Sequence, residues 1–242
     1  MALDSIGIDS FRNNGFLVCQ GLLPEEVTYA FENLFFSGAS EKILADAQNR
    51  RFYGPFPKED EYDSLDGSLI RRGFRWIDRR YSTNVWSYQS FLGSGPVLDI
   101  ASALLECSRD QLIGQLRGMY GTLPCCTASG EHMELCPHTD PHSFALGAVA
   151  YLHDVPKGGG GLCVWPSSHK EMSHAYSRVH GGDRMFDYHL ILNECLAKID
   201  LLEINGTRGD VIFWSNRLIH APGSNHSNRL RIALLGDFFL KE

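Results

Sequence analysis

Hydrophobic residues follow a helical spacing in the first part of the chain and shorter, strand-like runs in the second. Residues 10–22 predict a helix end, a glycine and then a short apolar strand. Pro24 and the two glutamates after it are typical of a helix N-terminus, and helically spaced apolar residues continue as far as Phe35. Ser94-Gly95-Pro96 introduces a second segment of helical spacing. The first part of the chain is therefore predicted to be mainly helical.

From Gln111 onward the chain consists of short segments rich in β-branched and aromatic residues, separated by glycines. A helical pattern over 183–199 interrupts them. Helices followed by many short strands predict an α+β, mainly β fold with an antiparallel barrel or sandwich. We expect one domain over 1–242, with a mainly helical part over 1–110 and the β core over 111–242. The predicted strands lie near 112–120, 131–136, 145–152, 162–165, 201–204, 210–214 and 230–239.

Composition excludes several classes of protein. The 242 residues include 22 Lys and Arg against 29 Asp and Glu, a net charge of −7, which argues against binding to a nucleic-acid backbone. The longest apolar run, 145–152, is far shorter than the about 20 residues that span a membrane. The N-terminus has no secretory pattern, and none of the seven cysteines forms a Cys-x-x-Cys pair. We therefore expect a cytoplasmic protein with reduced thiols.

A candidate metal site begins at His138-Thr139-Asp140. In extended backbone, residues i and i+2 project to the same side, so the imidazole and the carboxylate can reach one point. His220, at the far end of an apolar segment, is the candidate third ligand. Two histidines and one carboxylate with open positions are typical of non-haem Fe(II). Seven of the ten histidines lie between His132 and His180, but only His138 among them is predicted to bind metal.

Arg231 lies eleven residues after His220, in a segment of alternating apolar residues. A guanidinium buried in a barrel is costly unless an anion meets it. A dicarboxylate cosubstrate would supply that anion at one end and chelate a metal at the other. A surface position on the strand is the alternative interpretation of Arg231.

Motifs spread over nearly the whole chain resemble the phytanoyl-CoA hydroxylase-like (PhyH) branch of the Fe(II)/2-oxoglutarate-dependent oxygenases. The glycine-rich segment that ends in Trp165-Pro166-Ser167-Ser168-His169 is much more specific than His-x-Asp alone. The motifs are Phe11-x3-Gly15-Phe16-Leu17-Val18, His138-x-Asp140, Gly160 to Lys170, Gly209 to Trp214 and His220-x4-Asn225-x-Ser227-x3-Arg231.

The resemblance implies a double-stranded β-helix (jelly-roll, cupin-like) core with N-terminal helices and an inserted helix. It also implies Fe(II) as cofactor, with 2-oxoglutarate and O2 as cosubstrates and with succinate and CO2 released. His138, Asp140 and His220 would be the catalytic metal ligands. Halogenating relatives lack the carboxylate, so Asp140 favours hydroxylation or a related oxidation.

The resemblance also assigns the cosubstrate site. Arg231 would anchor 2-oxoglutarate, and Asn225 and Ser227 match polar positions of the family. Many relatives have a serine two residues after the distal histidine, where this chain has Pro222. Ser224 and Ser227 are candidates to replace its hydroxyl.

The substrate is expected to be a small molecule bearing a carboxylate or phosphate. An arginine cluster between residues 71 and 80 is interleaved with aromatic residues, which is typical either of a solvated face or of an anion clamp. The candidate substrate residues are His142, Arg75, Arg79 and Trp165. A zinc hydrolase at the same site and a non-catalytic jelly-roll binding module are the competing functions.

Overall fold

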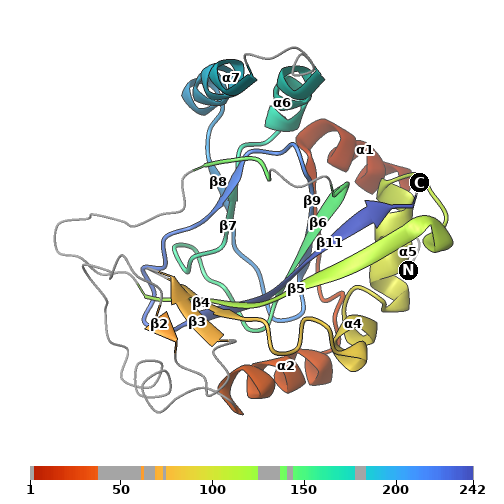
Figure 1. Cartoon of the computed structure of the whole chain (residues 1–242), viewed down its shortest axis with the longest axis vertical. Helices are drawn as coiled ribbons and strands as arrows, with labels where there is room; N and C mark the ends of the chain where they lie inside the picture. The colour runs from red at the N-terminus through yellow and green to blue at the C-terminus, as the bar shows by residue number, and fades with distance from the viewer. Residues whose placement is uncertain are drawn as a thin grey trace.

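Two antiparallel sheets form the framework of the protein (Figure 1). The computed structural model describes residues 3–37, 61–62, 69–72, 75–124, 137–140, 144–177 and 184–241. The larger sheet has the order β1-β9-β6-β11-β5-β4-β3-β2, and the smaller sheet has the order β10-β7-β8. The larger sheet contains β1 (Phe16–Cys19), β2 (Glu61–Tyr62), β3 (Leu69–Arg72), β4 (Arg75–Asp78), β5 (Leu112–Thr122), β6 (Leu146–Tyr151), β9 (Val211–Ser215) and β11 (Arg231–Leu240), and the smaller contains β7 (Leu162–Val164), β8 (Leu202–Ile204) and β10 (His220–Pro222).

Helices cover the outer face of the larger sheet. Asp4 caps the first of them by accepting a hydrogen bond from the Gly7 amide at 2.9 Å, and Gly15 ends it with a left-handed φ of +81°. This C-cap turns the chain directly into β1. The helices of this layer are α1 (Ser5–Asn14), α2 (Glu25–Ser37), α4 (Val85–Ser90) and α5 (Gly95–Leu104), followed by the short 3-10 turn η1 (Arg109–Gln111).

Alternation along β11 separates the two faces of the larger sheet. Ile232, Leu234 and Phe238 pack into the cluster that includes the helices, whereas Ala233 and Leu235 pack with residues of the smaller sheet. Successive side chains of a strand point to opposite faces, so the odd-numbered positions of β11 face the space between the two sheets. That space contains the functional residues described below.

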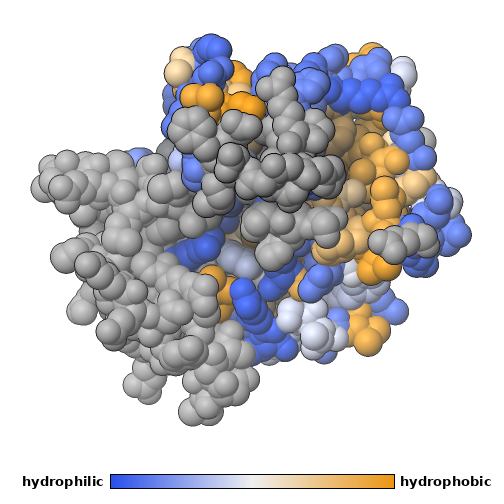
Figure 2. Space-filling model, turned by 45° about the horizontal axis from the view of Figure 1, so that its top comes forward, coloured by the Kyte–Doolittle hydropathy of each residue, from blue (hydrophilic) through white to orange (hydrophobic). Residues whose placement is uncertain are grey.

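A helical pair covers the smaller sheet. α6 (Ser168–Ser177) and α7 (Arg184–Lys198) lie side by side at the top of the view in Figure 1. Met172 and Leu192 pack there with Trp165 and Ile219, which flank the sheet. In the tilted view of Figure 2 the upper edge of the molecule is mostly hydrophilic, and an apolar area lies on its right-hand side. No helix within the described residues is long and apolar enough to span a membrane.

Most predicted elements are present in the structure, with shifted ends. The pattern over 183–199 forms α7, and the predicted strands outside 131–136 correspond to β5, β6, β7, β8, β9 and β11. The segment 131–136 lies outside the described residues. The first 110 residues also contribute β1 to β4 to the larger sheet, so this part is less purely helical than expected. A single domain over 1–242 stays a prediction.

Candidate metal centre

Strand pairing brings the two histidines together. His138 and His220 form an antiparallel bridge in which each backbone amide donates to the other's carbonyl, at 3.1 and 2.9 Å. His220 belongs to β10, where it also pairs with Val164 of β7. Directly paired residues of antiparallel strands point to the same face. The two imidazole centroids are accordingly 4.7 Å apart.

Asp140 completes a triad with these histidines. One ligand atom from each residue can be chosen so that all three lie within 4.8 Å of one another. The His220 Nδ1 atom lies 3.0 Å from the Leu218 carbonyl, which assigns the ring hydrogen to Nδ1 and leaves the Nε2 lone pair facing Asp140. That Nε2 atom is 3.3 Å from Asp140 Oδ2.

The triad fits a divalent metal ion. Asp140 Oδ2 is buried and has no hydrogen-bond partner in the part of the chain that the structure describes. Buried polar atoms normally have a partner, and this oxygen lies beside two imidazoles that can offer lone pairs. A cation between the three residues would satisfy it. Two nitrogen ligands and one oxygen ligand suit a first-row metal with open coordination positions.

Arg117 faces the triad because β5 contains a bulge. Leu235 pairs with Gly118 but Gly236 pairs with Leu116, so Arg117 is skipped in the strand register between β5 and β11. Gly118 has a φ of +128°. The extra residue reverses the alternation of β5, which places Arg117 on the same side of the sheet as Tyr120.

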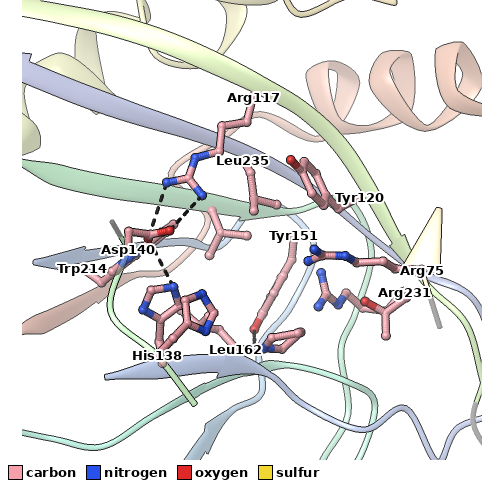
Figure 3. A pocket seen from close by; sticks show the side chains of 14 residues that line it. Arg75, Arg117, Tyr120, His138, Asp140, Tyr151, Leu162, Trp214, Arg231 and Leu235 are labelled. Atoms are coloured by element: carbon pink, nitrogen blue, oxygen red, sulfur yellow. Dashed lines mark hydrogen bonds and ion pairs between the residues drawn. The ribbon is translucent and has the colours of Figure 1, made fainter. Parts of the chain in front are cut away.

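Two carboxylates hold the Arg117 guanidinium. Its Nε and Nη2 atoms donate to Asp237 at 2.6 and 2.8 Å, and its Nη1 atom lies 3.5 Å from Asp140 Oδ1. The guanidinium carbon also lies 5.1 Å from the centre of the Phe144 ring. Figure 3 shows Arg117 on one side of Asp140 and His138 on the other.

These contacts keep Asp140 ionised. Burial by itself would raise the pKa of its carboxyl group, but the neighbouring His220 and Arg117 side chains outweigh burial. The pKa of Asp140 is therefore held well below its usual range. Burial would likewise lower the pKa of Arg117, but Asp237 and Asp140 reverse its effect and raise that pKa. Both groups are charged at neutral pH.

A cavity of about 180 Å³ opens beside the triad (Figure 3). Its walls combine an apolar part with three arginines and two tyrosines. Tyr151 is not a free hydroxyl, because it donates to the Ile204 carbonyl at 2.6 Å and accepts from the Leu162 amide at 2.9 Å. Burial raises its pKa to about 12. The lining residues include Arg75, Arg117, Tyr120, Thr122, Val149, Tyr151, Leu162, Trp214, Pro222, Arg231 and Leu235.

Arg231 is a buried cation in this cavity. Its exposed fraction is 5%, and its Nε atom donates to the Gly160 carbonyl at 2.7 Å. Within the described residues, no carboxylate forms an ion pair with it. Burial and the nearby charge of Arg75 both lower its pKa. The alternative of a surface position for Arg231 is therefore wrong.

Asn225 and Ser227 brace a turn. The Asn225 amide group donates to the carbonyls of Thr122 and Arg229, at 3.0 and 2.7 Å, and its oxygen accepts from the Ser227 hydroxyl at 2.6 Å. Neither side chain is among the described residues that line the cavity. These hydrogen bonds hold the turn that precedes Arg231, and a contact of Asn225 or Ser227 with the cosubstrate stays a prediction.

The predicted substrate residues separate into different places. Arg75 lines the cavity beside the triad, and Arg79 lines a second cavity of about 630 Å³ that shares Arg117, Tyr120 and Asp140 with the first. Trp165 is buried behind the smaller sheet, in the cluster with α6 and α7. His142 lies outside the described residues.

Part of the arginine cluster is structural. Arg80 pairs with the buried Asp78 at 2.7 Å and donates to the carbonyls of Leu34 and Phe35 near the end of α2. The anion-clamp interpretation therefore does not apply to Arg80. Its charge is already matched by the Asp78 carboxylate, two residues before it.

Sequence reasoning missed Arg117 and Asp237. Two glycines, Gly114 and Gly118, lie inside the strand predicted near 112–120. A glycine in a strand interior often marks a bulge, and a bulge reverses which side chains face the core. This signal could have placed Arg117 at the site, whereas strict alternation placed it on the opposite face from Tyr120.

Comparison with known proteins gives a family match and a common fold. The phytanoyl-CoA dioxygenase (PhyH) family matches residues 132–233. No curated protein sequence matches the chain. AviO1 from Streptomyces viridochromogenes Tue57 has a similar structure, with a TM-score of 0.60 and 16% identity, covering 99% of this chain and 96% of AviO1.

Two further solved structures share the architecture. The non-heme alpha ketoglutarate dependent carbocyclase SnoK from nogalamycin biosynthesis has a TM-score of 0.63 and 16% identity, over 98% of this chain and 83% of SnoK. EctD from S. alaskensis, solved with bound Fe, has a TM-score of 0.61 and 15% identity, over 98% of this chain and 77% of EctD. The predicted α+β, mainly β fold with a jelly-roll core is confirmed. The residues that the PhyH family matches include the whole triad and Arg231, and the solved structures share the fold of this chain.

Proposed function

We propose that the protein is an Fe(II)- and 2-oxoglutarate-dependent oxygenase that oxidises a small molecule and releases succinate and CO2. One observation supports this most strongly: the His138, Asp140 and His220 triad and the buried cation of Arg231 face the same small cavity. A metal site alone would suit many reactions. An arginine without a described carboxylate partner in that cavity favours an anionic cosubstrate.

The protein side chains would hold, orient and shield the reacting groups. When bound, Fe(II) would supply the activation of O2, which no protein side chain provides. The Leu218 carbonyl fixes the His220 tautomer, and Arg117 holds the Asp140 carboxylate. The apolar walls limit the access of water. They include Val149, Leu162, Trp214 and Leu235.

The second cavity supports a separate position for the substrate. It borders Asp140 and is more than three times as large as the first, about 630 against 180 Å³. Arg79, Gln115 and Ser82 give it a polar lining that includes one cation outside the first cavity. A substrate with a carboxylate or phosphate would match Arg79 and present a C–H bond near the triad. Hydroxylation is the proposed outcome, although relatives of this fold include a carbocyclase and an epimerase.

Succinate formation tests the proposal. Purified protein supplied with Fe(II), 2-oxoglutarate, O2 and ascorbate should form succinate slowly without added substrate and faster with a true substrate. His138→Ala and Arg231→Ala should each abolish most of this turnover, whereas Arg229→Gln, an exposed control two residues from Arg231, should retain it. Equal turnover in the wild type and both site variants would contradict the assignment. Turnover of a candidate substrate in the absence of O2 would favour zinc-dependent hydrolysis instead.

A further inference from the structure

Arg75 and Arg231 lie in one row across three neighbouring strands. Thr122 of β5 pairs with Arg75 of β4 on one side and with Arg231 of β11 on the other. Directly paired residues of antiparallel strands project to the same face, and all three residues line the cavity beside the triad. In Figure 3 the two guanidinium groups lie next to each other, across the cavity from His138 and Asp140.

Two like charges facing one cavity favour a shared anion. Arg231 is held by the Gly160 carbonyl, and the Arg75 guanidinium lies 5.6 Å from the centre of the Tyr120 ring, which restricts where it points. The charge of Arg75 disfavours the protonated form of Arg231. A carboxylate between the two guanidinium groups would remove this repulsion. Each of its oxygens can accept from a different arginine.

We infer that Arg75 and Arg231 together bind the distal carboxylate of a dicarboxylic 2-oxo acid, which makes Arg75 a second anchoring residue for the cosubstrate. This inference rests on the proposed function. It replaces the expectation that Arg75 contacts the substrate. It also accounts for Pro222, which lines the same cavity but has no hydroxyl to offer the carboxylate.

The size of the cavity agrees with this division of roles. The triad and the arginine pair occupy opposite sides of a space of about 180 Å³, so one small molecule can reach both. Arg79 directly follows β4, four residues after Arg75, and of the two cavities it lines only the larger. The two arginines of the original cluster are therefore assigned to different ligands.

A pair of 2-oxo acids tests the role of Arg75 by binding alone. The probes are 2-oxoglutarate and 2-oxopentanoate, which has the same carbon chain but a methyl group in place of the distal carboxylate. Their dissociation constants are measured by calorimetry on Mn(II)-loaded protein without O2. Arg75→Gln should raise the dissociation constant of 2-oxoglutarate roughly 10- to 100-fold, the usual effect of a lost charge-assisted hydrogen bond. It should change the dissociation constant of 2-oxopentanoate less than about twofold.

Matched variants separate this role from general effects of charge and shape. Arg231→Gln should give the same selective loss of affinity for 2-oxoglutarate, and Arg75→Lys should retain part of the affinity that Arg75→Gln loses. Arg229→Gln should bind both acids as the wild type does. The double variant Arg75→Gln/Arg231→Gln should lose less binding free energy for 2-oxoglutarate than the two single variants lose in sum, because both arginines bind one carboxylate. Thermal unfolding of each variant identifies any that does not fold, and Arg75→Lys then carries the comparison.

Three results would overturn the inference. If Arg75→Gln lowers the affinity for both acids equally, Arg75 shapes the cavity without binding the carboxylate. Unchanged affinity for both acids would place Arg75 away from the cosubstrate. If Mn(II)-loaded wild type binds neither acid, the proposed function itself fails, a result distinct from a loss confined to Arg75 variants.

Discussion

Arg117 contacts both oxygens of Asp140. Oδ1 accepts from its Nη1 atom at 3.5 Å, and the buried Oδ2, beside the two histidines, lies 3.4 Å from its Nη2 atom. Asp237 takes the other edge of the same guanidinium. The carboxylate of Asp237 therefore draws part of the Arg117 charge away from the metal ligand, and Asp237 acts as a positioning residue through Arg117.

Neutralising Asp237 should weaken metal binding. In Asp237→Asn the Arg117 guanidinium loses one of its two ionic partners and competes more strongly with the metal for Asp140, while the net positive charge near the site rises. Both effects act in the same direction. We expect Mn(II) affinity, measured by calorimetry, to fall about 10-fold, at the low end of effects for residues that orient metal ligands.

A matched variant provides the control for this experiment. Asp99→Asn removes an exposed carboxylate that pairs with Arg109 in a different part of the structure. It changes the net charge of the protein by the same amount and should leave Mn(II) affinity unchanged. Equal affinities of the two variants would mean that Asp237 has no influence on the metal site.

At the residue scale, the sequence predicts residues whose role follows from spacing. His138 and Asp140 are two apart in extended backbone, and Arg231 falls on the face of β11 that lines the cavity. Asn225 could not be placed in this way. Its amide donates to the nearby Arg229 carbonyl and to the distant Thr122 carbonyl, and the second contact depends on how the loop folds back on β5.

At the scale of elements, the bulge in β5 determines which side chains reach the site. A Cβ atom on Gly118 would lie 2.2 Å from the Asp78 carbonyl oxygen of the neighbouring strand. The positive φ of this residue also disfavours any other L-residue. The glycine is therefore required both by its conformation and by the close approach of β4.

Gly118→Ala should destabilise the protein and displace Arg117. Backbone strain alone costs on the order of 1–3 kcal/mol, and the clash with β4 adds to it. Gly21→Ala is the control, because Gly21 also has a positive φ but no heavy atom lies within 4 Å of its Cβ position. Urea unfolding should show a larger loss in the free energy of unfolding for Gly118→Ala than for Gly21→Ala. A loss no larger than that of Gly21→Ala would contradict the close packing.

His153 joins the end of β6 to β11 through a neutral imidazole. Its Nδ1 atom faces the Asp154 carbonyl at 2.9 Å, and its Nε2 atom accepts from the Ile232 amide at 2.9 Å. Burial is the main reason that its pKa is lowered from 6.5. As pH falls below 6.5, the unfolded chain gains a proton that the folded protein resists. The free energy of unfolding should therefore fall with pH.

His153→Gln should remove this part of the pH dependence. The contribution reaches at most about 1.4 kcal/mol one pH unit below 6.5, because one pKa unit corresponds to about 1.36 kcal/mol. Urea unfolding at pH 7.5 and 5.5 gives the change in stability for each protein. The wild type should lose more stability than the variant between these two values. Equal losses would show that His153 does not resist protonation in the folded state.

Short elements were the hardest to predict. The long runs of β5 and β11 carry enough apolar residues to be predicted from the pattern alone. β10 has three residues, one of them Pro222, and its pairing with β7 depends on contacts between distant parts of the chain. The strand that contains the distal histidine was therefore expected only as the end of an apolar segment.

At the scale of the whole molecule, net charge conceals where anions would bind. The protein has a charge of −7, yet Arg75, Arg117 and Arg231 line one cavity of about 180 Å³. The double sheet makes this possible, because helices cover the outer face of the larger sheet and its inner face combines apolar residues with these arginines. An overall acidic balance argues against nucleic-acid binding but does not oppose a small dianion.

Metal-dependent binding of 2-oxoglutarate is the most direct test of the central claim, that the triad and the arginines form one site. The ligand is titrated without O2 into the wild type and His220→Ala, each with and without Mn(II). We predict one molecule bound per chain in the wild type, with an affinity that depends strongly on Mn(II), and no Mn(II) effect in His220→Ala. An affinity that is the same with and without Mn(II) in the wild type would contradict the account.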